Sequence, residues 1–446
     1  MDDETLTSSS NHLEQAPPPK PPPKRFIKNQ IPQSILNDPS LNAAISLLPS
    51  NYDFEVHKSV HRVLSSGARR VALQFPDGLL MYSLPISDIL RSFASVDEVL
   101  VLADPTYGAC CLDDLAASAL GADLLIHYGH SCLVPVDVSV VPTLYVFVEI
   151  RTDPSHLVST VRSNLDPETT GRIALAGTVQ FAKTIAAAKP LFVESGYEVL
   201  VPQSKPLSAG EVLGCTAPTI RRSKLIDAVV FVADGRFHLE AFMIANPSIK
   251  AYRYDPYLGR LFVESYDHEG MKEVRKGAIL KARKASNWGV VFGTLGRQGN
   301  AGILGRLTAR MEERGIDPMV VMMSEISPMR MELFGDSVDA WVQIACPRLS
   351  IDWGDAFEKP MLTPFEAEIA LGFIKGWWEK EMMPSCMDMI KEGEGCGKDS
   401  CNCSCGRVDG ETDYPMDYYA QDGGEWNSAY ARKSASVQRR PRLRAR

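Results

Sequence analysis

The apolar residues of this chain gather in short runs that recur in the same order three times. The first run of each set is RVALQF at 70–75, RIALAG at 172–177 or WGVVFGTL at 288–295, and each leads into a Gly-containing loop. A second run follows at 98–102, 197–201 and 319–323. The third begins with an aspartate, in DLLIHYG at 123–129, DAVVFVA at 227–233 and DAWVQIA at 339–345. Short apolar runs bounded by turn residues are typical of buried strands.

These runs alternate with helix-like segments, an order that predicts βαβ units and parallel sheets. Their period of about 105–115 residues indicates three homologous α/β domains rather than a solenoid of short repeats. We expect lead-in helices at 31–63 and α/β repeats at 64–165, 166–285 and 286–382, the last ending in a closing helix. The Pro-rich stretch 1–30 and the Cys-containing, terminally basic stretch 383–446 show no apolar periodicity and are predicted to be disordered.

Composition narrows the class of protein without identifying it. A hydrophobic content of 45% and a charged content of 23% are ordinary for a soluble protein. The net charge of −8 gives no overall attraction to nucleic acid or an anionic membrane, so neither is expected as a direct partner. No apolar run reaches the roughly 18 residues that span a bilayer. The acidic start, MDDETLTSSS, argues against a signal or transit peptide, and a cytoplasmic location is the expectation.

Three of the ten cysteines occupy similar places in the repeats. Cys110 in TYGAC, Cys215 in VLGC and Cys346 in QIACP each follow a strand-like run, and ligands of parallel sheets bind beyond the carboxyl ends of strands. Cys346 follows the third strand of its repeat and the other two follow the second, so strict three-fold symmetry is not expected. We predict that the three thiolates converge on a metal or iron–sulfur centre that keeps one position open.

The other cysteines have less distinctive surroundings. Cys111 is expected to pack, and Cys132 in HYGHSC is expected to be a core thiol, with a role as fourth ligand as the alternative. The run from Cys396 to Cys405 contains four cysteines at a spacing that fits no zinc module, which leaves a labile metal or redox site open. The basic end, 432–446, leaves nuclear import or RNA contact as alternatives to a plain tail.

Polar loops at the same sheet edges supply candidate ligands for a small molecule. Arginines suit a carboxylate, and aspartates suit an amine or ribose hydroxyls, although each side chain is equally compatible with stabilising its own loop. There is no P-loop and no hydrolase grouping of Ser, His and Asp. The candidates are Gln74, Asp77, Gly78, Asp234, Arg236, His238, Arg297, Gln298, Arg348 and Asp352.

The motifs LQFPDGLL, DPTYGACCLDD, HYGHSC, LGCTAP, ADGRFHLEA, GTLGRQGN and ACPRLSIDWG, in this order, resemble the diphthamide-synthesis family over about residues 60–375. The resemblance implies a [4Fe–4S] cluster held by Cys110, Cys215 and Cys346, with one iron free for S-adenosylmethionine. It also implies a transferase that reductively cleaves a carbon–sulfur bond of this co-substrate. The 3-amino-3-carboxypropyl group then passes to a histidine of elongation factor 2, in the first step of diphthamide biosynthesis, and methylthioadenosine is released. The C-x-x-x-C-x-x-C motif of the usual radical enzymes is absent from the sequence, which agrees with this implication.

The resemblance further implies a heterodimer with a related second subunit, an external electron donor protein, and S-adenosylmethionine as the ligand of the polar candidates. Two alternatives stay open. Quinolinate synthase also joins three pseudo-repeated domains around a cluster with three cysteines, and uses the open iron as a Lewis acid for dehydration. The chain could instead be a non-catalytic scaffold subunit of the same complex, although the presence of all three cysteines argues against this.

Overall fold

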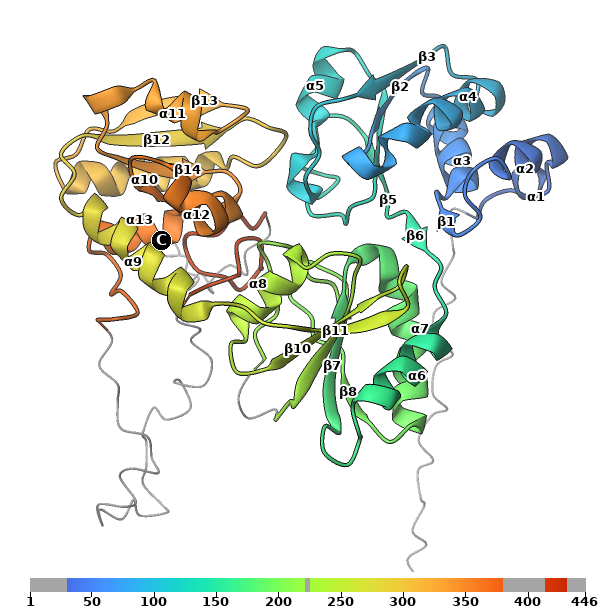
Figure 1. The fold of residues 1–446 in the computed structure, drawn as a ribbon. Coiled ribbons are helices and arrows are strands. Elements are labelled where there is room, and N and C mark those ends of the chain that lie inside the picture. The colour runs from blue at the N-terminus through green and yellow to red at the C-terminus, as the bar shows by residue number, and fades with distance from the viewer. Residues whose placement is uncertain (1–29, 221–224, 380–413, 431–446) are drawn as a thin grey trace, which may run out of the picture.

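The computed structural model describes residues 30–220, 225–379 and 414–430, and Figure 1 shows three sheets in three separate regions of the molecule. The strand orders are β3-β2-β4-β5, β8-β7-β9-β10-β11 and β13-β12-β14-β15. In all three sheets the first strand therefore lies between the second and the third, and only β10 and β11 pair antiparallel. The predicted α/β class with parallel sheets is confirmed. The strands are β2 Arg70–Gln74, β3 Glu98–Leu102, β4 Leu124–Tyr128, β5 Thr143–Val146, β7 Arg172–Gly177, β8 Glu198–Leu200, β9 Ala228–Val232, β10 Lys250–Asp255, β11 Arg260–Glu264, β12 Trp288–Gly293, β13 Met319–Met323, β14 Ala340–Ile344 and β15 Met361–Leu362.

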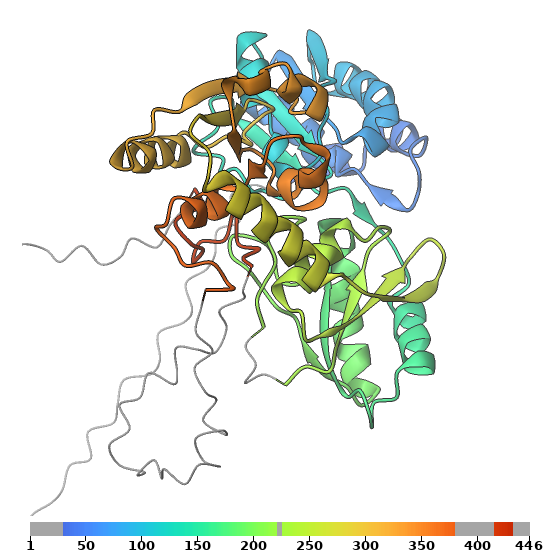
Figure 2. The same ribbon diagram turned by 60° about the vertical axis from the view of Figure 1, so that its left-hand side comes forward.

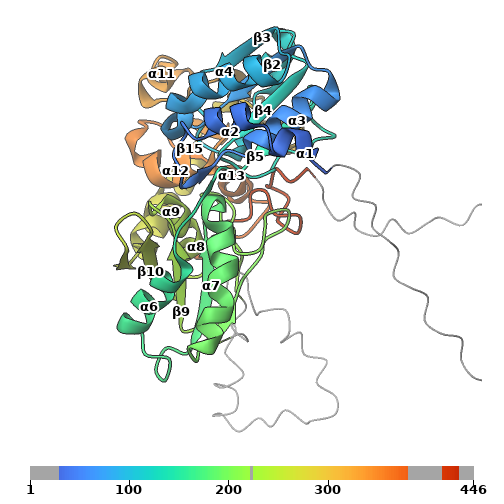
Figure 3. The ribbon, with the colours of Figure 1, turned by 90° about the vertical axis from the view of Figure 1, so that its right-hand side faces the viewer.

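Helices cover these sheets, and Figure 3 shows α4 over the first sheet and α7 along the second. Antiparallel pairing of β1 (Tyr52–Asp53) with β6 (Glu149–Ile150) joins the lead-in segment to the strand that precedes α6. No helix within the described ranges combines the length and apolar character needed to cross a membrane. The α-helices are α1 Gln33–Leu36, α2 Pro39–Ile45, α3 Val56–Ser66, α4 Ser83–Phe93, α5 Asp114–Ala119, α6 Pro154–Asn164, α7 Ala182–Glu194, α8 Phe237–Ala245, α9 His268–Ala282, α10 Ala301–Glu313, α11 Pro328–Glu332, α12 Pro347–Trp353 and α13 Pro364–Ala370.

The aspartate that recurs before each third strand has the same structural role in all three domains. Its carboxylate accepts hydrogen bonds from backbone N–H groups at or just before the start of the first strand, which ties the two strands together at their amino ends. All five residues of each third strand (β4, β9 and β14) are buried, as expected for central parallel strands. The bonds join Arg70 N to Asp123 Oδ2 at 2.8 Å, Arg172 N to Asp227 Oδ2 at 2.9 Å and Asn287 N to Asp339 Oδ2 at 2.8 Å.

The second and third domains share one continuous core. Phe231 of β9 and Val342 of β14 belong to the same cluster of buried apolar residues, whereas most of the first domain's core residues form separate clusters. A buried ion pair fastens α9 to α13 within the shared core. Arg275 Nε and Nη2 each donate to the Glu366 carboxylate at 2.7 Å, and both side chains are fully buried.

One sequence prediction fails at the carboxyl end of the chain. Residues 414–430, predicted to belong to a disordered tail, pack between the second and third domains (Figure 1), and Figure 2 shows them beside α9. Burial of aromatic side chains accounts for this order, because Tyr414, Tyr418 and Tyr419 are each at most 4% exposed. The predictions for residues 1–29, for the run Cys396 to Cys405 and for the basic end 431–446 lie outside the described residues.

Candidate metal centre

The three predicted cysteines come from three different domains to one buried region. Cys110 lies in a 3₁₀ turn, Ala109–Cys111, after β3; Cys215 lies in the loop after β8; and Cys346 caps the amino end of α12 after β14. A hydrogen bond to Cys111 and burial raise the pKa of Cys110, and charge on Cys215 and Cys346 adds to this shift, so the three thiols lie near one another. The sheet edges therefore deliver one cysteine each to a common place.

Burial keeps these thiols protonated until a bound metal displaces their protons. Burial raises the pKa of Cys215 to about 12, and nearby Cys346 contributes to this shift. Burial also raises the pKa of Cys346, although backbone N–H groups of Arg348 and Leu349 oppose that shift. Metal ions bind thiolates, so loading such a site releases protons and depends on pH.

Three thiols from three loops are a ligand set that an iron–sulfur cluster can use. Within the part of the chain that the structure describes, no three His, Cys, Asp or Glu side chains are arranged around one metal ion. In a [4Fe–4S] cluster each thiolate binds a different iron, so its ligands surround a larger body and do not meet at a point. One buried and two half-buried thiols from three elements, the buried one hydrogen-bonded by the Thr216 hydroxyl (Oγ1 to Cys215 Sγ, 3.8 Å), are compatible with such an arrangement.

Of the two neighbouring cysteines, Cys111 is buried as predicted and Cys132 is not. Cys111 is buried as expected, but its thiol also accepts a hydrogen bond from Gln298 Nε2 at 3.4 Å. A hydrogen bond from Cys110 is the main cause that lowers the pKa of Cys111 to about 7. Cys132, predicted to be a core thiol, is exposed, because the turn after β4 directs it outward while its neighbour Ser131 is buried.

Gln74, predicted to bind the co-substrate, instead holds the Cys110 loop. Its Nε2 donates to the carbonyl oxygen of Cys111 at 2.8 Å and to Thr106 Oγ1 at 3.3 Å. Its Oε1 accepts from Asp113 N at 3.1 Å and bonds His127 Nδ1 at 2.8 Å. Both donors and both acceptor positions of the amide are thus used within the protein.

Arg297 connects the third domain to the same loop. Its guanidinium makes two parallel 2.7 Å bonds to the Asp114 carboxylate, and its backbone N–H donates to the carbonyl oxygen of Cys110 at 2.8 Å. The adjacent Gly296 has φ +54°, and a Cβ there would lie 2.4 Å from the backbone of Cys111. Glycine is therefore required where these two loops touch.

Arg348 has an equivalent role between the third and second domains. Its guanidinium is 3% exposed and pairs with Asp352 at 2.8 Å and Glu240 at 2.5 Å. Its Nη1 donates to the carbonyl oxygens of Gly214 (3.2 Å) and Phe237 (2.8 Å). Arg348 and Asp352, predicted as co-substrate ligands, therefore link α12 to the Cys215 loop.

The remaining candidates lie nearer the surface. Asp77, Gly78 and Asp234 are exposed at the carboxyl edges of the first two sheets, and no atom lies within 4 Å of a Cβ built on Gly78. Arg236 is also exposed and pairs with Glu240 at 2.7 Å. His238 is partly buried at the start of α8.

Two histidines that were not predicted as site residues, His127 and His130, lie near His238. Buried His127 bonds His130 (Nε2 to Nδ1, 3.1 Å), and His130 is close enough to His238 for charge on one to disfavour charge on the other. A sequence signal for His130 did exist. It stands seven residues after the repeated aspartate of the first domain, the place that Asp234 and Cys346 occupy in the other two.

These histidines predict that the apoprotein loses stability as pH falls. Burial lowers the pKa of His130 to about 3 and of His238 to about 4, so below pH 6.5 the unfolded chain binds protons that the folded chain excludes. Each group is expected to cost about 2 kcal/mol of unfolding free energy at pH 5 and nothing at pH 7.5. Urea unfolding at both pH values measures this loss, and His238→Gln is expected to reduce it by about 2 kcal/mol. An identical loss in wild type and variant would contradict the assignment.

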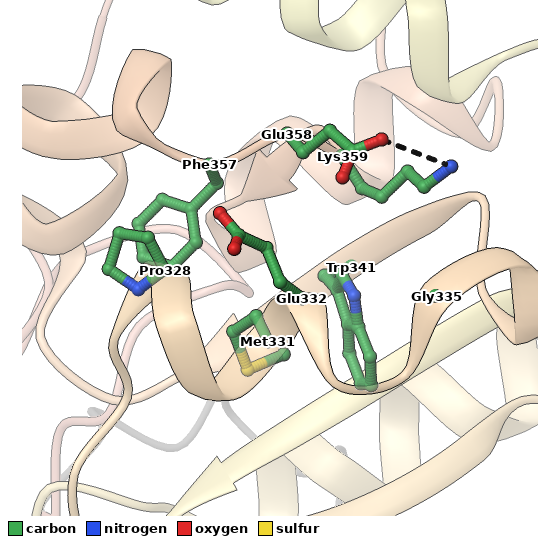
Figure 4. Close-up of a pocket in the computed structure, with 8 residues that line it drawn as sticks. All are labelled: Pro328, Met331, Glu332, Gly335, Trp341, Phe357, Glu358 and Lys359. Carbon is green, nitrogen blue, oxygen red and sulfur yellow. Dashed lines mark ion pairs between the residues drawn. The ribbon is translucent and has the colours of Figure 1, made fainter.

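A surface pocket elsewhere in the third domain is separate from this chemistry. Its walls come from α11, β14 and the 354–359 segment, and Figure 4 shows Trp341, Met331 and Phe357 among them. None of the predicted ligand residues lines it.

Fold and site together define a three-domain α/β protein in which each domain brings one cysteine to a shared buried region. A family model described as "Putative diphthamide synthesis protein" matches residues 75–383. The chain belongs to this diphthamide synthesis family.

Named relatives agree with the family. The chain is 49% identical over 395 residues to 2-(3-amino-3-carboxypropyl)histidine synthase subunit 1 of Gibberella zeae, covering 89% of this chain and 78% of the relative. It is 53% identical over 348 residues to the human protein of the same name, covering 77% and 78%. Among solved structures, Dph2 from Pyrococcus horikoshii with a 4Fe–4S cluster superposes with a TM-score of 0.61 at 27% identity, covering 74% of this chain and 93% of that one.

Proposed function

We propose that this chain is a catalytic subunit that transfers the 3-amino-3-carboxypropyl group of S-adenosylmethionine to a histidine of elongation factor 2. The observation that carries the proposal is the meeting of Cys110, Cys215 and Cys346, one from each domain, in a member of the diphthamide synthesis family. The relatives named as synthase subunit 1 and the archaeal structure with a 4Fe–4S cluster support it.

In this proposal the three cysteines hold a [4Fe–4S] cluster. When bound and reduced, such a cluster supplies one electron and an open iron for S-adenosylmethionine. The chain's own contribution is placement and exclusion of water. Gln74 and Arg297 fix the Cys110 loop, and Arg348 ties the Cys215 loop to α12, so that the thiols are held from three directions in a buried setting.

The predicted co-substrate ligands fall into two groups under this proposal. Gln74, Arg297, Gln298, Arg348 and Asp352 act indirectly, because their polar groups bind the protein itself. The residues at the carboxyl edges of the first two sheets remain proposed to contact S-adenosylmethionine, since open α/β sheets bind ligands there. These are Asp77, Gly78, Asp234, Arg236 and His238.

The proposed partners follow from the same assignment. The relatives' name, subunit 1, supports a second subunit, which we propose to be a related chain. Elongation factor 2 as protein substrate, an external electron donor protein and a cytoplasmic setting are proposed from the family resemblance. A scaffold role without catalysis is the second candidate. The quinolinate-synthase alternative loses support because the family match is to diphthamide synthesis proteins.

An anaerobic assay tests the proposal. The chain with its cluster reconstituted, mixed with the second subunit, elongation factor 2, S-adenosylmethionine and dithionite, is expected to release methylthioadenosine. It is also expected to add one aminocarboxypropyl group to the factor, as chromatography and intact-protein mass spectrometry would show. Omission of this chain is the control. An intact cluster without methylthioadenosine would refute the transferase assignment, and full activity without this chain's cluster would favour the scaffold role.

A further inference from the structure

Residues 414–430, named here the C-terminal strap, run directly across the Cys215 loop. Ala217 N donates to the carbonyl oxygen of Met416 at 2.8 Å, and Thr216 forms an antiparallel bridge with Asp417. Tyr418 N donates to the carbonyl oxygen of Cys215 at 3.4 Å. The strap therefore pairs with the loop backbone as a short strand would.

Two hydrogen bonds of Thr216 connect the strap to the sulfur of Cys215. Its hydroxyl accepts a hydrogen bond from Tyr419 N at 3.0 Å and donates to Cys215 Sγ at 3.8 Å. Thr216 is fully buried, so the hydroxyl rotor is fixed by the strap's N–H on one side and oriented toward sulfur on the other. Without the strap, this hydroxyl would lose the donor that orients it.

Tyr419 packs in the core beside the cysteine loops. Its side chain is 4% exposed and belongs to the same buried cluster as Cys215 and Ala109, against which Cys110 packs. The ring therefore lies in the core that the Cys110 and Cys215 loops share. At this position an aromatic side chain excludes water from the sulfurs.

The strap is held firmly enough to position other groups. Tyr414 donates from its hydroxyl to Glu366 Oε1 at 2.7 Å at one end, and Trp426 stacks edge-on against Phe365 near the other, with ring centroids 4.8 Å apart. Within the strap, Asp417 accepts from Gly424 N and from Trp426 Nε1, both at 2.8 Å. The strap lies beyond residues 75–383, the part of the chain that the family model matches.

We infer that the C-terminal strap is a working part of the metal centre, with Thr216 and Tyr419 as positioning residues for the proposed cluster ligand Cys215. This inference depends on the proposed function for the identity of the cluster. Thr216 adds a hydrogen bond to sulfur, which raises the reduction potential of a thiolate-bound cluster, and Tyr419 limits solvent access to it.

The first test needs no cluster. In the full-length apoprotein, Tyr419→Ala is expected to make Cys215 react with iodoacetamide about tenfold faster, because shielding is lost, whereas Thr216→Val is expected to make it react about tenfold more slowly, because the hydroxyl that donates to the thiolate is lost. Peptide mapping by mass spectrometry measures the alkylation of Cys215 separately from that of the other cysteines. Thr216→Ser is expected to restore the wild-type rate, and Thr169→Val, in an exposed turn of the second domain, is the matched control. Thermal melts establish that each variant is folded.

The second test uses protein that has taken up the proposed cluster. Thr216→Val is expected to lower the cluster's midpoint potential, measured by redox titration with EPR, and Thr216→Ser to restore it. Tyr419→Ala is expected to speed loss of visible absorbance in air, whereas Tyr419→Phe keeps the ring and the wild-type rate. Wild-type rates of Cys215 alkylation in folded Thr216→Val and Tyr419→Ala would overturn the inference. Failure of wild-type protein to take up any cluster would instead overturn the proposed function, and the alkylation result would still stand.

Discussion

Replacing Cys215 with alanine is expected to remove the proposed cluster and to lower the proposed aminocarboxypropyl transfer at least about a hundredfold. The thiol is one of the three proposed ligands, and alanine offers no sulfur in its place. Two remaining thiolates hold a [4Fe–4S] cluster poorly. Cys110→Ala and Cys346→Ala are expected to behave in the same way. Iron and sulfide analysis with the anaerobic visible spectrum measures the loss, and methylthioadenosine release measures activity.

Cys111→Ala is the matched control for this series. Cys111 is adjacent to Cys110, more buried than it in the same loop and hydrogen-bonded by Gln298, so its removal is at least as disruptive to local packing. We expect this variant to keep most of its cluster. Cluster loss in Cys111→Ala, with retention in Cys110→Ala, would exchange the two ligand assignments. Retention of cluster and activity in all three single variants would refute the site.

Replacing Arg275 with methionine is expected to lower the free energy of unfolding by about 3–5 kcal/mol. The change leaves the Glu366 carboxylate fully buried without the guanidinium that now makes two 2.7 Å bonds to it. Glu366 also accepts from Tyr414 and closes the capping box with Thr363 at the start of α13, so α9, α13 and the strap all meet at this carboxylate. Urea denaturation of the apoprotein at pH 7.5 measures the loss.

Two further variants separate charge burial from packing. Tyr414→Phe removes one hydrogen bond to the carboxylate and is expected to cost about 2 kcal/mol. The double variant Arg275→Met with Glu366→Met removes both charges, and is expected to be more stable than Arg275→Met alone because no uncompensated ion remains. A double variant less stable than Arg275→Met would show that shape, and not the unpaired charge, dominates at this position.

The sequence predicted the sheets because their signal is local. The first and third strands of each set are mostly buried apolar runs, whereas the second strands β3, β8 and β13 are more exposed and lie at sheet edges. The aspartates before β4, β9 and β14 recur because the same backbone N–H groups need an acceptor in each domain. The place of the three cysteines followed from topology, since the carboxyl ends of parallel strands share an edge. No such rule predicted the strap, whose tyrosines stand in a polar, Gly-rich part of the sequence.

The arginines show a different limit of prediction. A guanidinium in a polar loop indicates that a carboxylate will be bound, but the sequence does not tell whose. Arg297 and Arg348 do bind carboxylates, yet these belong to Asp114, Glu240 and Asp352 of the protein itself. The pair Arg348–Asp352 is local, at i and i+4, but the pairs Arg297–Asp114 and Arg348–Glu240 depend on how the domains pack and have no signature in any one loop. The sequence alone therefore does not distinguish an arginine that stabilises a loop from one that binds a ligand.

The C-terminal strap has a consequence for the order in which this molecule can be completed. A ribosome makes residues 414–430 after all three cysteine loops, and domains fold from the amino end as the chain emerges. The Cys215 loop thus lacks this partner until residues 414–430 have been made, and until then Thr216 lacks the donor from Tyr419. Under the proposed function, iron delivered before that point would meet an unsealed site, and stable loading is expected only after the strap has been made.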